Sequence, residues 1–367
     1  MDLETLGAAG LYDADAPDAA ERAELLAFLI EQGCSVDEMV SANARGRLFA
    51  LAGDRIVRPD RDRFTLVEVA EQVDAPVADV RALWRSFGLV EADPTQPVAS
   101  PADVDMIRTG VAMAGLLGMD TTRGMARVMG SAMARIGDAA STSVRGSLPS
   151  MSVAISGSEL ETARSFAVVA TAVPALGRTL DALFRHHLEA ARMHFERTES
   201  WEVVGQGGIR IGVGFTDLCG FTGLTQQLSM DNLSQLLSKF EEVAADVVQD
   251  HGGRLVKFIG DAVMFITTDA LTAVEVAEAL VAAASERGLM ARAGVTAGTA
   301  LALDGDYFGP IVNLAARLVA LAEPGAVLVS EPVSERLAGA RAVISLGPQT
   351  IRGFDDPVTV SRLTPTV

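Results

Sequence analysis

The chain contains few cysteines, histidines and aromatic residues. Its two cysteines, Cys34 and Cys219, lie far apart and match no metal-ligand spacing. So few cysteines in a chain of 367 residues suit a reducing compartment, and we expect a cytoplasmic protein.

Positive charge is also scarce. The formal net charge of −18 argues against broad affinity for nucleic acids, whose phosphates recruit lysine and arginine. The first four residues, Met-Asp-Leu-Glu, lack the basic start of a secretory signal. The longest apolar run, near 166–176, is broken by Pro174, so we expect no membrane span. With 49% hydrophobic and 21% charged residues, the chain is long enough for two packed domains.

Residues 1–160 read as helices separated by polar turns. Apolar residues recur at helical spacing within 21–32 and 37–51, and further helices are predicted over 77–87, 102–117 and 122–136. Thr65 followed by Glu68 is typical of a capping box at a helix start. Residues 137–160 are rich in serine, glycine and alanine, which predicts the least regular part of this half. A helix over 159–197, kinked at Pro174, is expected to join the two halves.

After residue 201 the pattern changes to alternating strands and helices. The expected order β-α-β-β-α-β indicates a ferredoxin-like sheet with helices on one face. The fold class is therefore α+β, with an all-helical N-terminal domain. We expect domains at 1–160 and 201–367, joined by a linker helix over 161–200.

Three segments of the second half carry polar residues suited to phosphate chemistry. Asp217 ends a strand at a turn that includes Gly220, Phe221 and Thr222, whose backbone N–H groups could cradle phosphates. Asp261 lies at the tip of a predicted hairpin. If the two strands are neighbours, Asp217 and Asp261 can converge on Mg²⁺ or Mn²⁺.

The third segment supplies an amide and a guanidinium. Asn313 and Arg317 are four residues apart, so on a helix they share one face. Arginine suits the negative charge of a phosphoryl transition state.

These three segments, in this order, resemble those of class III adenylyl cyclases over residues 205–365. The resemblance implies metal binding at Asp217, Leu218 and Asp261, with two divalent cations, Mg²⁺ or Mn²⁺, at each site. It also implies purine reading by Lys257 and Asp306, and contact of Arg292 with the triphosphate. The implied catalytic residues are Asn313, which would orient the ribose, and Arg317, which would stabilise the transition state.

The resemblance also implies the substrate and the assembly. A lysine donor and an aspartate acceptor complement N1 and the 6-amino group of adenine, so Lys257 and Asp306 favour ATP over GTP. Family members build each site from two subunits, and both sets of residues lie on this chain. A homodimer with two equivalent sites is therefore expected.

The N-terminal half leaves several interpretations open. Residues 64–89 resemble a helix-turn-helix of the MerR type, so one alternative is a DNA-binding regulator whose second half senses nucleotide. The whole layout resembles soluble mycobacterial-type cyclases with an autoinhibitory, pH-sensing N-terminal domain. His186, His187 and His194 lie on the joining helix, where protonation could shift it; the alternative is that they are plain solvated histidines.

One further expectation concerns methionine. A methionine-rich set of helices could hold a lipid, although such residues more often form ordinary core. The residues concerned are Met106, Met113, Met119, Met125, Met129 and Met133.

Overall fold

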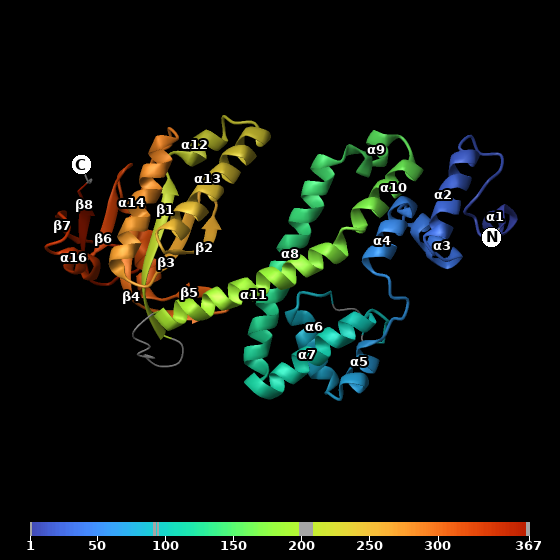
Figure 1. Cartoon of the computed structure of the whole chain (residues 1–367), viewed down its shortest axis with the longest axis horizontal. Helices are drawn as coiled ribbons and strands as arrows, with labels where there is room; N and C mark the ends of the chain where they lie inside the picture. The colour runs from blue at the N-terminus through green and yellow to red at the C-terminus, as the bar shows by residue number, and fades with distance from the viewer. Residues whose placement is uncertain (1, 91–92, 94, 198–207, 365–367) are drawn as a thin grey trace. The chain divides into compact units, whose positions relative to one another are not determined.

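The computed structural model of the chain describes residues 2–90, 93, 95–197 and 208–364, without the side chains of residues 194–197 and of Thr222. Two compact units make up the chain, Met1–His187 and Leu188–Val367. Figure 1 shows a helical first unit and a second unit built on a sheet.

The described part of the first unit is helical. Its helices are α1 (Leu3–Ala8), α2 (Ala19–Glu31), α3 (Val36–Ala44), α4 (Leu51–Val57), α5 (Leu66–Val73), α6 (Val77–Ser86), α7 (Pro101–Leu117), α8 (Met119–Ser147), α9 (Val153–Ser156) and α10 (Glu159–Ala170), with short 3-10 turns at Leu48–Ala50 and Pro149–Met151. Helix α11 (Val173–Arg197) begins in this unit and continues past its boundary at His187. The predicted capping box is present, since Thr65 accepts from the backbone N–H of Glu68 and Glu68 accepts from that of Thr65.

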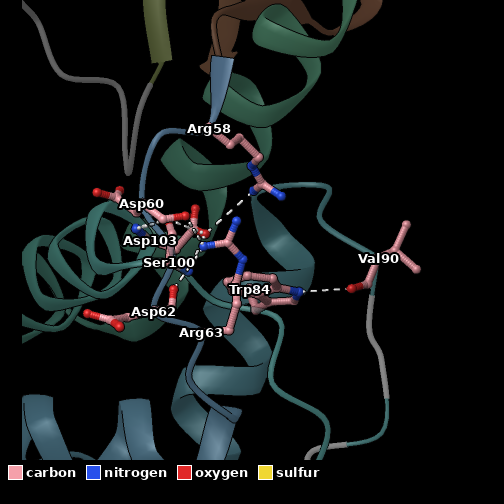
Figure 2. Close-up of polar contacts among 8 residues, drawn as sticks. All are labelled: Arg58, Asp60, Asp62, Arg63, Trp84, Val90, Ser100 and Asp103. Atoms are coloured by element: carbon pink, nitrogen blue, oxygen red, sulfur yellow. Dashed lines mark hydrogen bonds and ion pairs between the residues drawn. The ribbon is translucent and has the colours of Figure 1, made fainter. Parts of the chain in front are cut away.

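Helices α5 and α6 form the expected helix-turn-helix, and α7 packs across them. Leu66, Leu83 and Ile107, one from each helix, are fully buried in a common apolar cluster. Polar contacts lie at the edge of this three-helix cluster (Figure 2). Arg58 forms an ion pair with Asp103 at 3.5 Å, and the indole N–H of Trp84 donates to the Val90 carbonyl oxygen at 3.0 Å.

A second polar contact in the same place holds the loop that precedes α5. The Arg63 guanidinium donates to the carbonyl oxygens of Asp60 and Asp62, both at 2.8 Å (Figure 2). Arg63 thus satisfies backbone acceptors of its own loop and holds that loop in a compact turn.

Three expectations for this half need correction. Helix α8 continues to Ser147, well into the stretch expected to be irregular. The joining helix is not one kinked rod: α10 ends at Ala170, and a turn over Thr171–Ala172 separates it from α11. Pro174 is the second residue of α11, a position where its missing N–H costs no helical hydrogen bond.

The expectation that no segment could span a membrane also needs correction. By length and hydropathy, the stretch Glu159–Met193 is long and apolar enough to cross a membrane, although the turn between α10 and α11 interrupts it. Core helices of other proteins meet the same criterion.

The second unit is built on one mixed sheet. Its strands are β1 (Gly208–Leu218), β2 (Arg254–Ile259), β3 (Ala262–Thr267), β4 (Ala291–Leu303), β5 (Asp306–Phe308), β6 (Val327–Ser330), β7 (Val343–Gln349) and β8 (Val358–Leu363). The order is β2-β3-β1-β4-β6-β8-β7, with β5 paired to β4. The helices are α12 (Phe221–Thr225), α13 (Met230–Asp250), α14 (Ala270–Glu286), α15 (Pro310–Leu321) and α16 (Glu331–Leu337).

Helices cover both faces of this sheet, so the expectation of one covered face is wrong. Ala293 and Val295 of β4 belong to the apolar cluster that contains residues of α13, α14 and α16. Gly294, between them, faces the other way, and a Cβ there would lie 2.6 Å from the carbonyl oxygen of Ala315 in α15. The α+β class with a ferredoxin-like core is confirmed, and α15 lies against the second face.

Candidate active site

Two carboxylates meet where β1 ends. Strands β1 and β3 pair in antiparallel register, with Asp217 opposite Ala262, the residue that follows Asp261 in the hairpin. Gly260 takes a φ of 62° and closes the turn between β2 and β3. The backbone N–H of Leu218 donates to the carbonyl oxygen of Asp261 at 3.4 Å. The two sheet strands therefore hold Asp217 and Asp261 side by side.

The environment of Asp261 opposes its negative charge. Burial raises the pKa of this carboxyl, and the neighbouring charge of Asp217 raises it further, against a lowering by Arg292. Two half-buried carboxylates lying side by side carry more negative charge than the single positive charge of Arg292 offsets. A site of this kind favours binding of an added cation.

Arg292 is that nearby cation. It lies opposite Asp217 in the pairing of β1 with β4, and its guanidinium donates to Asp217 at 3.1 and 3.3 Å. Its other nitrogen donates to the carbonyl oxygens of Ala320 and Ala322 at 3.5 and 3.4 Å. This contact was missed from the sequence, which suggested only a triphosphate role, because the register of two strands 75 residues apart decides it.

The donor set fits a hard divalent ion that keeps open positions. Within the described ranges there is no cluster of three or more His, Cys, Asp or Glu side chains able to hold a metal. Two carboxylates and the backbone around Leu218 would leave several ligand positions to water or to phosphate oxygens. Mg²⁺ binds in this way in nucleotide sites, through one or two carboxylates plus substrate phosphates.

The turn after Asp217 leads directly into α12. Gly220 has a φ of 75° and precedes the helix, and Phe221 packs against the apolar cluster beneath it. The backbone N–H of Cys219 donates to the Met290 carbonyl oxygen at 2.7 Å. Burial raises the pKa of the Cys219 thiol. The side chain of Thr222 lies outside the described residues.

A second pair lies on other strands. Lys257 of β2 is one of the two lysines in the chain, and its ammonium contacts the Asp306 carboxylate of β5. The other oxygen of Asp306 accepts from the Tyr307 backbone N–H at 2.8 Å. These side chains are 38% and 27% exposed, so the pair can still reach a ligand. It presents one donor and one acceptor next to each other.

Asn313 and Arg317 occupy the outer side of α15. Ala315 between them is fully buried against the sheet, whereas both polar residues are exposed. With about 100° of rotation per residue, each points roughly opposite to Ala315. The structure thus brings Asp217, Asp261 and Arg292 together and joins Lys257 to Asp306, but it turns the α15 pair away from the sheet that carries the carboxylates.

The proposed regulatory histidines lie on α11. His186 and His187 are exposed, and the side chain of His194 lies outside the described residues. Arg185 beside them donates to Asp181 at 2.9 Å. The six methionines differ in their surroundings. Met106 and Met119 pack against the helix-turn-helix core, and Met113 is half-buried, whereas Met125, Met129 and Met133 are exposed along α8.

Comparison with known proteins gives matches over most of the chain. The adenylate cyclase regulatory domain family matches residues 4–191, and the adenylate and guanylate cyclase catalytic domain family matches residues 204–360. An uncharacterized protein of Mycobacterium tuberculosis is 42% identical over 99% of this chain and 94% of its own length.

Relatives with named activities are more distant. An adenylate cyclase of Streptomyces coelicolor is 32% identical over 76% of this chain and 73% of its own. A pH-sensitive adenylate cyclase of M. tuberculosis is 29% identical over 94% and 88% respectively. Among solved structures, an adenylyl cyclase of P. aeruginosa is 26% identical and covers 44% of this chain and 96% of its own, with a TM-score of 0.40.

The raised pKa of Asp261 predicts opposite effects of one substitution on stability and on cation binding. Ionised Asp261 is less favourable in the folded chain than in the unfolded chain, so its charge costs stability at neutral pH, and the cost fades as pH falls through the raised pKa. Asp261→Asn should therefore raise the melting temperature in chelator by a few degrees.

The same variant should lose the increase in melting temperature that Mn²⁺ gives the unsubstituted protein. Asp250→Asn, at an exposed carboxylate that ends α13, is the matched control and should change neither value. A lower melting temperature for Asp261→Asn in chelator, together with an intact response to Mn²⁺, would show that the carboxylates do not form a cation site.

Proposed function

Because the chain belongs to the adenylate cyclase family, with a regulatory domain followed by a catalytic domain, we propose that it converts ATP to 3′,5′-cyclic AMP and pyrophosphate at sites shared by two copies. The observation that carries this proposal is the meeting of Asp217 and Asp261 beside Arg292. Of the two starting hypotheses, the family assignment favours the enzyme over the DNA-binding regulator.

The reaction joins the ribose 3′-oxygen to the α-phosphorus. The new O–P bond forms as the bond from the α-phosphorus to the bridging oxygen breaks, and pyrophosphate leaves with that electron pair. Asp217, Asp261 and the backbone at Leu218 would hold two divalent cations, Mg²⁺ or Mn²⁺. When bound, such cations make the hydroxyl more acidic and offset the charge of the phosphates.

The side chains of the protein bind and orient the nucleotide. The backbone at Gly220 and Phe221, with Thr222, would border the phosphates. Arg292, which donates to Asp217, would also contact the phosphates. Asn313 would orient the ribose, and Arg317 would stabilise the charge that develops at the α-phosphate. The hydroxyl proton passes to solvent, since we assign no protein base.

The orientation of α15 supports an active site that needs a second copy. Asn313 and Arg317 point away from the sheet, so one chain does not aim them at its own Asp217. A symmetric dimer brings the outer side of α15 from one copy to the carboxylates of the other. It contains two such sites, each with metal ligands from one copy and purine and transition-state residues from its partner.

Mixing two inactive variants tests the shared site. Asp217→Ala and Arg317→Ala should each abolish activity alone, because each damages both sites of its own homodimer. Random mixing makes half of the dimers heterodimers with one intact site, so about a quarter of the cyclase activity should return. The measurement is cyclic AMP formation after subunit exchange.

Asp217→Ala mixed with Asp261→Ala is the matched control. Both changes damage the metal half of a site, so no heterodimer has an intact one, and no activity should return. Equal recovery in the two mixtures, or none in the first despite verified exchange, would contradict the shared site.

The Lys257–Asp306 pair supports ATP as the substrate. The ammonium can donate to adenine N1, and the carboxylate can accept from the 6-amino group. Guanine reverses both polarities, since N1 carries a hydrogen and position 6 an oxygen. A mismatch at both atoms leaves buried polar groups unpaired, which strongly disfavours the wrong base.

Reversing the polarity of both residues should reverse the base preference. Lys257→Glu combined with Asp306→Ser presents an acceptor to guanine N1–H and a donor to O6. We expect the ratio of kcat/KM for GTP to that for ATP to rise at least about tenfold. Lys257→Ala with Asp306→Ala is the control and should lose ATP activity without gaining GTP activity; equal ratios in the two variants would remove base reading from this pair.

We further propose that the helical domain restrains the catalytic domain and that pH releases it. Supporting observations are the match to a regulatory domain family and the likeness to a cyclase named as pH-sensitive. His186 and His187 are exposed on α11, between Arg185 and Glu189 and near Arg192, so protonation adds charge to the helix that joins the two domains.

Mild acidification should therefore raise the activity of the full-length protein several-fold between about pH 8 and about pH 6. Replacing His186, His187 and His194 together with glutamine should flatten this profile. His251→Gln is the matched control, because this fourth histidine lies at the end of α13, and it should leave the profile unchanged. A triple variant with the original pH response would exclude the α11 histidines as the sensor.

A further inference from the structure

A pocket of about 310 Å³ lies between α13 and α14 of the second unit. The two helices pack against each other over one face of the sheet (Figure 1). The floor of the pocket consists of small side chains, Ala244 of α13 with Ala283 and Ala284 of α14, and all three are buried. Larger side chains at these positions would fill the space between the helices, so the alanines keep it open.

The walls of the pocket are apolar. Leu236, Phe240 and Val243 come from α13, Leu280 comes from α14, and Leu289 lies just after α14. Among the described residues that line the pocket there is no carboxylate, although the chain contains 48 acidic residues. An interior of this kind favours a ligand with an apolar body, because a buried polar group would find no partner on these walls.

Two positive side chains complete the lining. Lys239 belongs to α13, Arg287 follows the last residue of α14, and both are exposed, so they lie at the mouth of the pocket. Lys239 forms no ion pair with any other residue that the structure describes. Arg287 donates to the Ala283 carbonyl oxygen at 2.8 Å, and the exposed carboxylate of Glu286 lies 3.7 Å from it. The mouth of the pocket is therefore a positive spot in a chain of net charge −18.

We propose that this pocket binds a small aromatic monocarboxylate. The planar ring lies on the alanine floor, and the carboxylate at the mouth accepts from Lys239 and Arg287, whose guanidinium matches the two carboxylate oxygens. Pockets for small molecules measure about 300–1,000 Å³. A pocket of about 310 Å³ is at the lower end of that range, so it suits one or two rings better than a long acyl chain or a nucleotide.

The pocket shares its walls with segments that support the active site. The Phe240 ring packs edge-on against Phe258 of β2, with ring centroids 6.4 Å apart. Leu289 precedes Met290, whose carbonyl oxygen accepts from the Cys219 N–H in the loop after β1. A ligand in contact with Phe240 and Leu289 is therefore placed to act as an effector of the catalytic residues, a consequence that rests on the proposed function.

Calorimetric titration of the full-length protein with 2-naphthylacetate tests the site. We expect saturable binding of this acid. The amine 2-naphthylethylamine keeps the apolar ring but reverses the charge, so it should bind at least about tenfold more weakly. Equal affinities for the two compounds, or no measurable binding of the acid, would overturn the proposal.

Removing the two cations tests the mouth of the pocket. Lys239→Gln combined with Arg287→Gln should weaken the binding of 2-naphthylacetate at least about tenfold, because hydrogen bonds from charged donors are lost. Arg336→Gln with Arg352→Gln is the matched control, since it removes the same charge from two exposed residues that do not line the pocket. The control should keep the original affinity. Equal affinities in the two double variants would count against the site.

Filling the floor tests the apolar part of the pocket. Ala283→Leu occupies the space above the alanines, so binding of 2-naphthylacetate should be lost although both cations remain. A melting temperature close to that of the unsubstituted protein shows that the variant is folded. Binding retained by the folded variant would place the ligand elsewhere and reject the pocket; if the variant does not fold, the two charge variants decide.

The measurements separate this site from the proposed function. Calorimetry without nucleotide or metal does not depend on catalysis, so selective binding in a protein that does not cyclise ATP supports the site and rejects the cyclase. In an active protein, saturating 2-naphthylacetate should change the rate of cyclic AMP formation at least about twofold. The Lys239→Gln, Arg287→Gln variant should show no such change. Selective binding with an unchanged rate would reject the role as an effector.

Discussion

The site depends on one electrostatic constraint: two carboxylates of like charge are held together at the end of β1. The register of β1 with β3 fixes the backbone positions from which the two side chains extend. Burial and mutual repulsion raise the pKa of Asp261, while Arg292 offsets only part of the charge. The fold thus holds two like charges together at a cost in free energy, which the cations of the proposed site would offset.

The sheet supports the proposal that the active site needs a second copy. Helices α13, α14 and α16 share one apolar cluster on one face, while α15 packs on the other face through the glycine at position 294. That packing buries Ala315 and leaves Asn313 and Arg317 on the outer side. The groups assigned to metal binding and to the transition state therefore face different directions, which a two-fold dimer can reconcile.

The sequence predicted local structure best where one short-range signal dominates. The predicted hairpin with Asp261 at its tip is present between β2 and β3, and the capping box at Thr65 begins α5. Features set by distant partners were not predictable: the contact of Arg292 with Asp217 depends on strand register, and the coverage of the second face depends on the crossing of α15. Composition misled at α8, because a stretch rich in serine and alanine continues as helix to Ser147. Pro174 was expected to kink a helix but instead lies near the start of one.

The most direct test of the central claim is product analysis with purified full-length protein, ATP and Mn²⁺. The account predicts equal amounts of 3′,5′-cyclic AMP and pyrophosphate, formed only when a divalent cation is present, and no product from a variant that lacks both carboxylates. Release of ADP and phosphate in place of these products, or cyclic AMP formation that persists without Asp217 and Asp261, would contradict it.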